Sequence, residues 1–249
     1  MLLYWILAFA IAWAITLPGA LAKLGLIGHS PVPFMAGTLI GVAPLAAALI
    51  VTAREGKFRA YWSSLWRLPR PWWTVAVALL LPPLMLAITY AVKPTEVDFA
   101  SLGIFPLVWL VLAFGEEAGW RGYALPRLVD RYGFWVGSLI LGVVWCVWHY
   151  PKMLGNPYVP NVADLLPLLG LFSIQIILAN FIICWLYFRS GRSVIATTLF
   201  HTCFNVMSTA YAWAAADWVF TGLIAAIVVT IAVLDGKSLP RRGAAMAPA

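Results

Sequence analysis

The feature that most constrains this chain is a succession of apolar runs, each about twenty residues long, that recur as far as residue 234. A helix needs about 20 apolar residues to cross the hydrocarbon layer of a bilayer. Charged residues make up only 10% of the sequence, against about 25% in a typical soluble domain. The strands of a membrane β-barrel would alternate apolar and polar residues instead. The sequence therefore predicts an all-α, polytopic transmembrane helical bundle.

We expect eight transmembrane helices in a single membrane-embedded domain, residues 1–249. The segment LPGALA before Lys23 resembles a signal-peptidase site, but no basic segment precedes it, so residues 1–22 are expected to remain as the first helix. Residues 236–249 are basic and rich in Pro and Ala, and are predicted to be a disordered cytoplasmic tail. The predicted spans are residues 2–22, 32–53, 72–92, 103–120, 134–150, 164–188, 193–212 and 215–234.

The basic residues are unequally divided between the two sides of the predicted bundle. One side holds 13 of the 16 Lys and Arg residues, and the other holds Lys23, Lys93 and Lys152. The positive-inside rule then places both termini in the cytoplasm, and we expect a prokaryotic plasma membrane. Because this rule accounts for the net charge of +7, no nucleic-acid partner is expected. Residues 54–73 interleave basic and aromatic side chains, which fits either an interfacial helix or an ordinary basic loop.

Ionisable residues inside a bilayer are costly and therefore point to function. The span at 103–120 contains Glu116 and Glu117, followed by Arg121. Glu117 and Arg121 stand one helical turn apart and can form an ion pair, whereas Glu116 points about a quarter-turn away and lacks that partner. A carboxylate without a cation in an apolar environment can accept and return a proton near neutral pH. Glu116 is thus the predicted catalytic carboxylate.

Two of the three histidines, His149 and His201, fall within predicted spans. Asn205 follows His201 by four residues, so both side chains can donate hydrogen bonds to one oxyanion. These residues and Glu116 come from three different helices, and we expect them to share one polar site. Residues regarded as helix-contact or helix-end positions are left outside the site: Gln175, Asn180 and Asp217.

Three motifs follow one another along the chain: EExxxR at 116–121, an aromatic-xxxH at 145–149, and HxxxN at 201–205. As an ordered set they resemble the CPBP family of CAAX-protease and bacteriocin-processing intramembrane endopeptidases, over roughly residues 75–235. One departure is Trp145, where the family usually has Phe. The resemblance implies that Glu116 and His149 activate water, that His201 and Asn205 stabilise the oxyanion, and that Glu117 and Arg121 support the site.

No cofactor is expected, although Glu116, His149 and His201 could alternatively bind zinc as in a metalloprotease.

The predicted spans place the motif residues at different depths in the membrane. At 1.5 Å per residue, Glu116 and His201 would lie roughly 10–14 Å from the cytoplasmic surface and His149 nearer 20 Å. Either the helix that carries His149 begins in the cytoplasm, or residues 121–133 fold back.

The expected function is hydrolysis of a peptide bond in a membrane-associated or lipidated, CAAX-like peptide or protein. The partners are therefore that substrate and the lipid bilayer, and the sequence gives no indication of the oligomeric state. Two alternatives remain open. A buried Glu with Arg and His partners could serve a proton-coupled transporter, and the same fold could serve a non-catalytic bacteriocin-immunity-type membrane protein.

Overall fold

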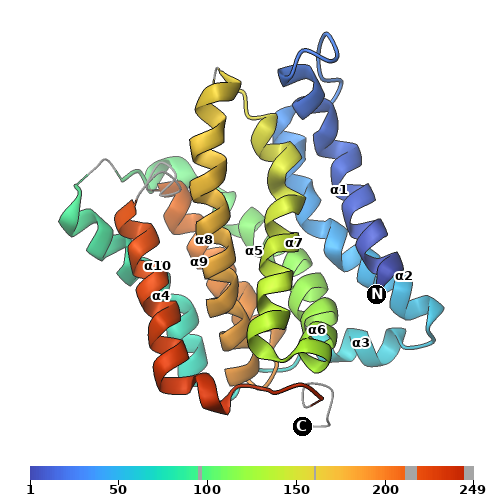
Figure 1. The fold of residues 1–249 in the computed structure, drawn as a ribbon, viewed down its shortest axis with the longest axis vertical. Coiled ribbons are helices and arrows are strands. Elements are labelled where there is room, and N and C mark those ends of the chain that lie inside the picture. The colour runs from blue at the N-terminus through green and yellow to red at the C-terminus, as the bar shows by residue number, and fades with distance from the viewer. Residues whose placement is uncertain (95–96, 160, 211–217, 244–249) are drawn as a thin grey trace.

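The computed structural model describes residues 1–249 except 95–96, 160, 211–217 and 244–249, and the described part is helical with no β-strand (Figure 1). The prediction of a polytopic helical bundle is confirmed. The elements are α1 (Leu2–Lys23), η1 (Phe34–Val42), α2 (Ala43–Arg54), α3 (Phe58–Leu65), α4 (Trp73–Val92), η2 (Ala100–Leu102), α5 (Phe105–Glu117), η3 (Ala118–Ala124), α6 (Leu125–Tyr132), α7 (Phe134–Leu154), α8 (Val162–Arg189), α9 (Val194–Ala210), α10 (Trp218–Asp235) and η5 (Gly236–Ser238).

Six helical segments of the described chain are long and apolar enough to cross a membrane: Leu2–Lys23, Phe34–Arg54, Trp73–Val92, Phe134–Leu154, Val162–Arg189 and Trp218–Ser238. They coincide with six of the eight predicted spans. The other two predicted spans correspond to α5 and α9, which have 13 and 17 residues. The count of eight therefore stays a prediction. Parts of the predicted spans 193–212 and 215–234 lie outside the described residues.

The helix that contains the glutamate pair runs on past the predicted end of its span. α5 continues through η3, which is a π-helix, into α6 and ends at Tyr132. Gly133 has φ 78°, a left-handed conformation that favours glycine, and it reverses the chain into α7. Residues 121–133 therefore do not fold back on the span at 103–120. Glu116 and His149 lie at nearly equal distances along the chain from this turn.

The backbone of η1 and α2 packs directly on α5 and η3, at glycines that the sequence places one turn apart. A Cβ on Gly115 would lie 2.5 Å from the Gly41 carbonyl oxygen, and one on Gly119 would lie 2.3 Å from Pro44 Cβ. From α3, the Tyr61 hydroxyl donates a hydrogen bond of 2.9 Å to the Ala118 carbonyl of the π-helix. Burial raises the pKa of Tyr61, which keeps this hydroxyl protonated as the donor.

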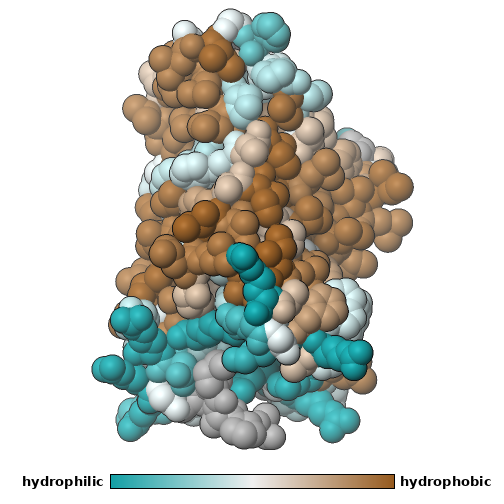
Figure 2. All heavy atoms as spheres, turned by 90° about the vertical axis from the view of Figure 1, so that its right-hand side faces the viewer, coloured by the Kyte–Doolittle hydropathy of each residue, from teal (hydrophilic) through white to brown (hydrophobic). Residues whose placement is uncertain are grey.

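Hydrophilic surface gathers at one end of the molecule, and hydrophobic surface covers the middle, as Figure 2 shows for one face. The N-terminal end of α1 and the last residues of the described chain lie toward this end (Figure 1). α3 lies within the segment 54–73, so part of that segment is a helix, with Tyr61 and Leu65 buried and Trp62 exposed. The apolar helices and this surface describe an integral membrane protein.

The C-terminal segment is more ordered than the sequence predicts. Arg189 forms an ion pair with Asp235, and the side chain of Leu239 is buried. The Phe134 amide donates a hydrogen bond to the Pro240 carbonyl, and the Gly243 amide donates one to the Asp130 carbonyl. Residues 236–243 thus pack against the turn between α6 and α7 instead of forming a disordered tail, and Pro240 supplies an acceptor for the Phe134 amide at the start of α7. Residues 244–249 lie outside the described residues.

Candidate active site

The motif residues meet in one cavity of about 130 Å³ between α5, α7, α8 and α9. Glu116 from α5, His149 from α7 and the pair His201 and Asn205 from α9 all line it. The difference in depth expected for His149 therefore does not separate the motifs, since the α5–η3–α6 helix is long enough to match α7. Liquid water occupies about 30 Å³ per molecule, so the cavity has room for several waters.

Glu116 is held by a residue of the second motif. Its side chain is 7% exposed, and its Oε2 accepts a hydrogen bond of 2.8 Å from the indole Nε1 of Trp145. No ion pair of Glu116 occurs within the described residues, as the helical spacing predicts. Oε1 has no hydrogen bond to the described chain, so it is the oxygen left for a ligand in the cavity.

Glu117 and Arg121 form the core of a buried polar network. Arg121 Nη1 lies 2.8 Å from Glu117 Oε1, and both side chains are fully buried. Arg121 Nη2 donates to Asn180 Oδ1 at 2.9 Å, and the Asn180 amide donates to the Ser138 carbonyl. The predicted pair is therefore present. The sequence does not predict the third member, Asn180, because nothing local links α8 to this position.

The hydrogen bonds of the two histidines determine which ring nitrogen faces the cavity. His149 Nδ1 lies 2.8 Å from the Trp145 carbonyl, and His201 Nδ1 lies 2.9 Å from Glu117 Oε1. A carbonyl and a carboxylate accept hydrogen bonds, so each Nδ1 carries the proton and each Nε2 is left for a ligand. A His201 ring that carries protons on both nitrogens could also donate from Nε2.

Trp145 occupies the centre of the site. Its ring lies edge-on to His149 and His201, with centroid distances of 5.7 and 5.3 Å. The guanidinium carbon of Arg121 lies 4.6 Å from the centroid of the same ring. A phenylalanine, which the family usually has here, would keep these ring contacts but could not donate to Glu116.

The cavity wall also contains polar atoms that the described protein does not satisfy. Trp109 Nε1 and Ser208 Oγ are buried without a hydrogen-bond partner among the described residues, and both residues line the cavity. Buried polar groups are normally hydrogen-bonded, so these donors are suited to a bound peptide or water. Neither residue belongs to a motif, and the sequence alone offered no signal for them. Gln175, which the sequence does not place in the site, also lines the cavity.

The alternative of a zinc site requires Glu116, His149 and His201 to converge on one point. Within the described residues, no three His, Cys, Asp or Glu side chains are close enough to hold a metal ion. The described residues do not form this convergence, and no step proposed below depends on a metal ion.

Comparison with known proteins places these motif residues within a recognised domain. Residues 98–207 match the family model described as type II CAAX prenyl endopeptidase Rce1-like. This segment is similar to the Rce1-like CAAX prenyl endopeptidases. The matched segment contains all three motifs and lies inside the segment 75–235. The resemblance to CAAX proteases is confirmed.

A curated relative supports the same assignment. The chain is 30% identical to the CAAX prenyl protease 2 of Methanococcus maripaludis over 148 residues, which cover 53% of this chain and 55% of the relative. The chain thus spans about half the length of the curated relative it matches. Both comparisons support a similarity to CAAX proteases, and the activity of the whole protein is a proposal.

Proposed function

We propose that this protein is an intramembrane endopeptidase of the CAAX-protease type that hydrolyses a peptide bond without a metal ion. One observation carries the proposal: Glu116, His149, His201 and Asn205, which lie on three helices, line the same buried cavity. The Rce1-like domain supports a protease.

In the proposed reaction, Glu116 Oε1 takes a proton from a water molecule that also donates a hydrogen bond to His149 Nε2. The water oxygen attacks the peptide carbonyl carbon, and the carbonyl oxygen becomes an oxyanion. Protonated His201 and the Asn205 carboxamide donate to that oxyanion. Glu116 then returns the proton to the amide nitrogen, and the C–N bond breaks. Trp145 keeps the Glu116 carboxylate oriented throughout.

The substrate that we propose is a membrane-associated peptide or protein with a lipidated C-terminus. The matched relative is named a CAAX prenyl protease, and a CAAX motif is a C-terminal sequence whose cysteine is prenylated. The hydrophilic end of the molecule carries the basic loops and would face the cytoplasm of a prokaryotic cell, with both termini there. A substrate anchored in the cytoplasmic leaflet could then reach the cavity from that side.

The test is cleavage of a farnesylated CAAX peptide by the detergent-purified protein. Glu116→Gln should lower kcat about 10²- to 10⁴-fold, the usual contribution of a general base, with unchanged expression and thermal unfolding. Glu55→Gln is a matched control, because Glu55 is a partly exposed carboxylate paired with Arg127 at 3.9 Å.

A second experiment tests whether cleavage requires a metal ion. The wild-type protein should keep its rate after dialysis against a strong zinc chelator. If the Glu116→Gln protein cleaves the peptide at the wild-type rate, the glutamate mechanism is contradicted. If the chelator stops cleavage by the wild-type protein and added zinc restores it, the reaction depends on a metal ion.

A further inference from the structure

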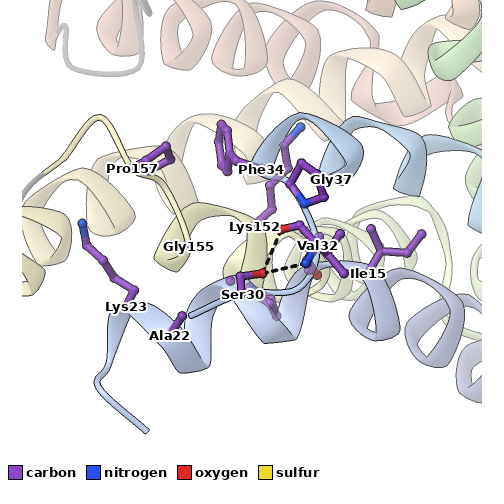
Figure 3. A pocket seen from close by; sticks show the side chains of 14 residues that line it. Ile15, Ala22, Lys23, Ser30, Val32, Phe34, Gly37, Lys152, Gly155 and Pro157 are labelled. Atoms are coloured by element: carbon purple, nitrogen blue, oxygen red, sulfur yellow. Dashed lines mark hydrogen bonds between the residues drawn. The ribbon is translucent and has the colours of Figure 1, made fainter. Parts of the chain in front are cut away.

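Lys152 lies in the last turn of α7, three residues after His149, and its position is unusual for a lysine. It lines the active-site cavity and also a second pocket of about 410 Å³. That pocket lies between the end of α1, the chain at 30–34, η1 and the end of α7 (Figure 3). Lys152 is the one residue of the described chain that lines both spaces.

The Lys152 ammonium has neither a hydrogen bond nor an ion pair with any residue that the structure describes. Lys23, which lines the same second pocket, instead donates to the carbonyls of Asn156 and Val159. The aliphatic stem of Lys152 packs on Gly37, where a Cβ would lie 3.6 Å from Lys152 Cγ. Lys152 is only partly exposed. A cation in such a poorly solvated place is costly unless an anion pairs with it.

Within the described part of the chain, Glu116 is the carboxylate that acts electrostatically on Lys152. Lys152 interacts electrostatically with Glu116, but no ion pair within 4.0 Å joins them in the described chain. Glu116 Oε2 is occupied by Trp145. The missing anion is therefore best supplied by a ligand that enters the cavity.

We propose that Lys152 binds the C-terminal carboxylate of the substrate; this inference rests on the proposed peptidase function. Along α7, Lys152 lies roughly 4.5 Å farther than His149 from the basic end of the molecule. A substrate that enters from that end presents its scissile bond at His149, and its last residues continue toward Lys152. Each extended residue spans about 3.3–3.6 Å, so only a few residues fit between the scissile bond and the carboxylate.

The test uses two prenylated peptides that are identical except for the C-terminus, which is a free acid in one and an amide in the other. Wild-type protein should cleave the acid with a kcat/KM about 10- to 100-fold higher, the range for a hydrogen bond to a charged group. Lys152→Ala and Lys152→Gln should reduce this preference to about 1 by raising the KM of the acid alone. Lys152→Arg should restore part of it.

Lys23→Ala is the matched control, because it removes a lysine of the neighbouring pocket that is already bound to carbonyl groups. Its acid-to-amide ratio should equal that of the wild-type protein. Binding of both peptides to the Glu116→Gln protein gives the same comparison without turnover, with tighter binding of the acid expected.

Several results would overturn the proposal. If the wild-type protein cleaves the acid and the amide equally, the carboxylate site is rejected while the peptidase function stands. This result is expected if Lys152 binds a lipid phosphate. An equal loss for both peptides in Lys152→Ala shows that Lys152 acts on Glu116 instead. If the wild-type protein cleaves neither peptide, the proposed peptidase function is rejected. Binding to the Glu116→Gln protein then tests the carboxylate site without turnover, and equal binding of acid and amide rejects that site as well.

Discussion

At the scale of single residues, the site depends on contacts between the motifs as much as on the motifs themselves. Trp145 belongs to the second motif but donates its indole proton to Glu116 of the first, and its ring lies beside His201 of the third. Arg121 of the first motif contacts the same ring. One aromatic side chain thus joins three helices around the proposed water site.

Trp145→Phe should lower kcat about tenfold with little change in KM. The phenyl ring preserves the contacts with the histidines and Arg121, but Glu116 loses a hydrogen bond to a charged group, which contributes about 1.5–3 kcal/mol. Steady-state cleavage of the prenylated peptide measures the effect. Trp185→Phe is the control, because it removes an indole hydrogen bond of 2.7 Å to the Asp235 carboxylate, and neither residue lines the cavity. A similar loss of kcat in both variants would contradict a positioning role for Trp145.

Arg121→Ala should destabilise the fold by about 3–5 kcal/mol, because the buried Glu117 would lose its guanidinium partner and keep only His201. Thermal unfolding in detergent measures this loss. Arg127→Ala removes a partly exposed arginine that pairs with Glu55 at 3.9 Å and donates a hydrogen bond to the Tyr123 carbonyl. It should cost less, about 1–2 kcal/mol. Equal unfolding temperatures for the two variants would show that the buried pair does not stabilise the helix packing.

At the scale of helices, the decisive feature is the close approach of the η1–α2 backbone to α5 and η3. This approach is possible because Gly115 and Gly119 present no side chain to Gly41 and Pro44. Small residues allow such close packing between membrane helices, where the hydrophobic effect supplies no driving force. The contact braces the helix at the position of Glu116 and Glu117.

Gly119→Ala should separate these helices, since its Cβ would lie 2.3–2.5 Å from atoms of Pro44, including backbone. Overpacking of this kind costs about 1–3 kcal/mol, and we expect both the unfolding temperature and the cleavage rate to fall. In Gly222→Ala, the new Cβ meets no atom within 4 Å, so helix propensity alone should stabilise the protein slightly. The prediction fails if Gly119→Ala is as stable as Gly222→Ala.

At the scale of the whole molecule, the asymmetry of charge predicts the orientation in the membrane. His29 lies in an exposed loop after α1, and Lys57 lies in the exposed loop between α2 and α3, near the basic end. The native cysteines offer little background, because Cys146 and Cys184 are buried and Cys203 is partly buried.

An impermeant maleimide applied to intact cells should therefore label His29→Cys but not Lys57→Cys. Permeabilised cells should show labelling of both, which controls for reactivity. Labelling of Lys57→Cys in intact cells together with protection of His29→Cys would reverse the predicted topology.

The sequence by itself determined the helical membrane architecture, the pairing of Glu117 with Arg121 and the ordered motifs that carry the Rce1-like resemblance. These features are local, because twenty apolar residues suffice for a span and the 3.6-residue period places i and i+4 on one face. Only the tertiary structure decided that Trp145 holds Glu116, that Asn180 joins Arg121 and that Lys152 reaches the cavity. Each of these contacts depends on which helices pack together and how each is rotated about its axis, and no spacing along the chain encodes that rotation.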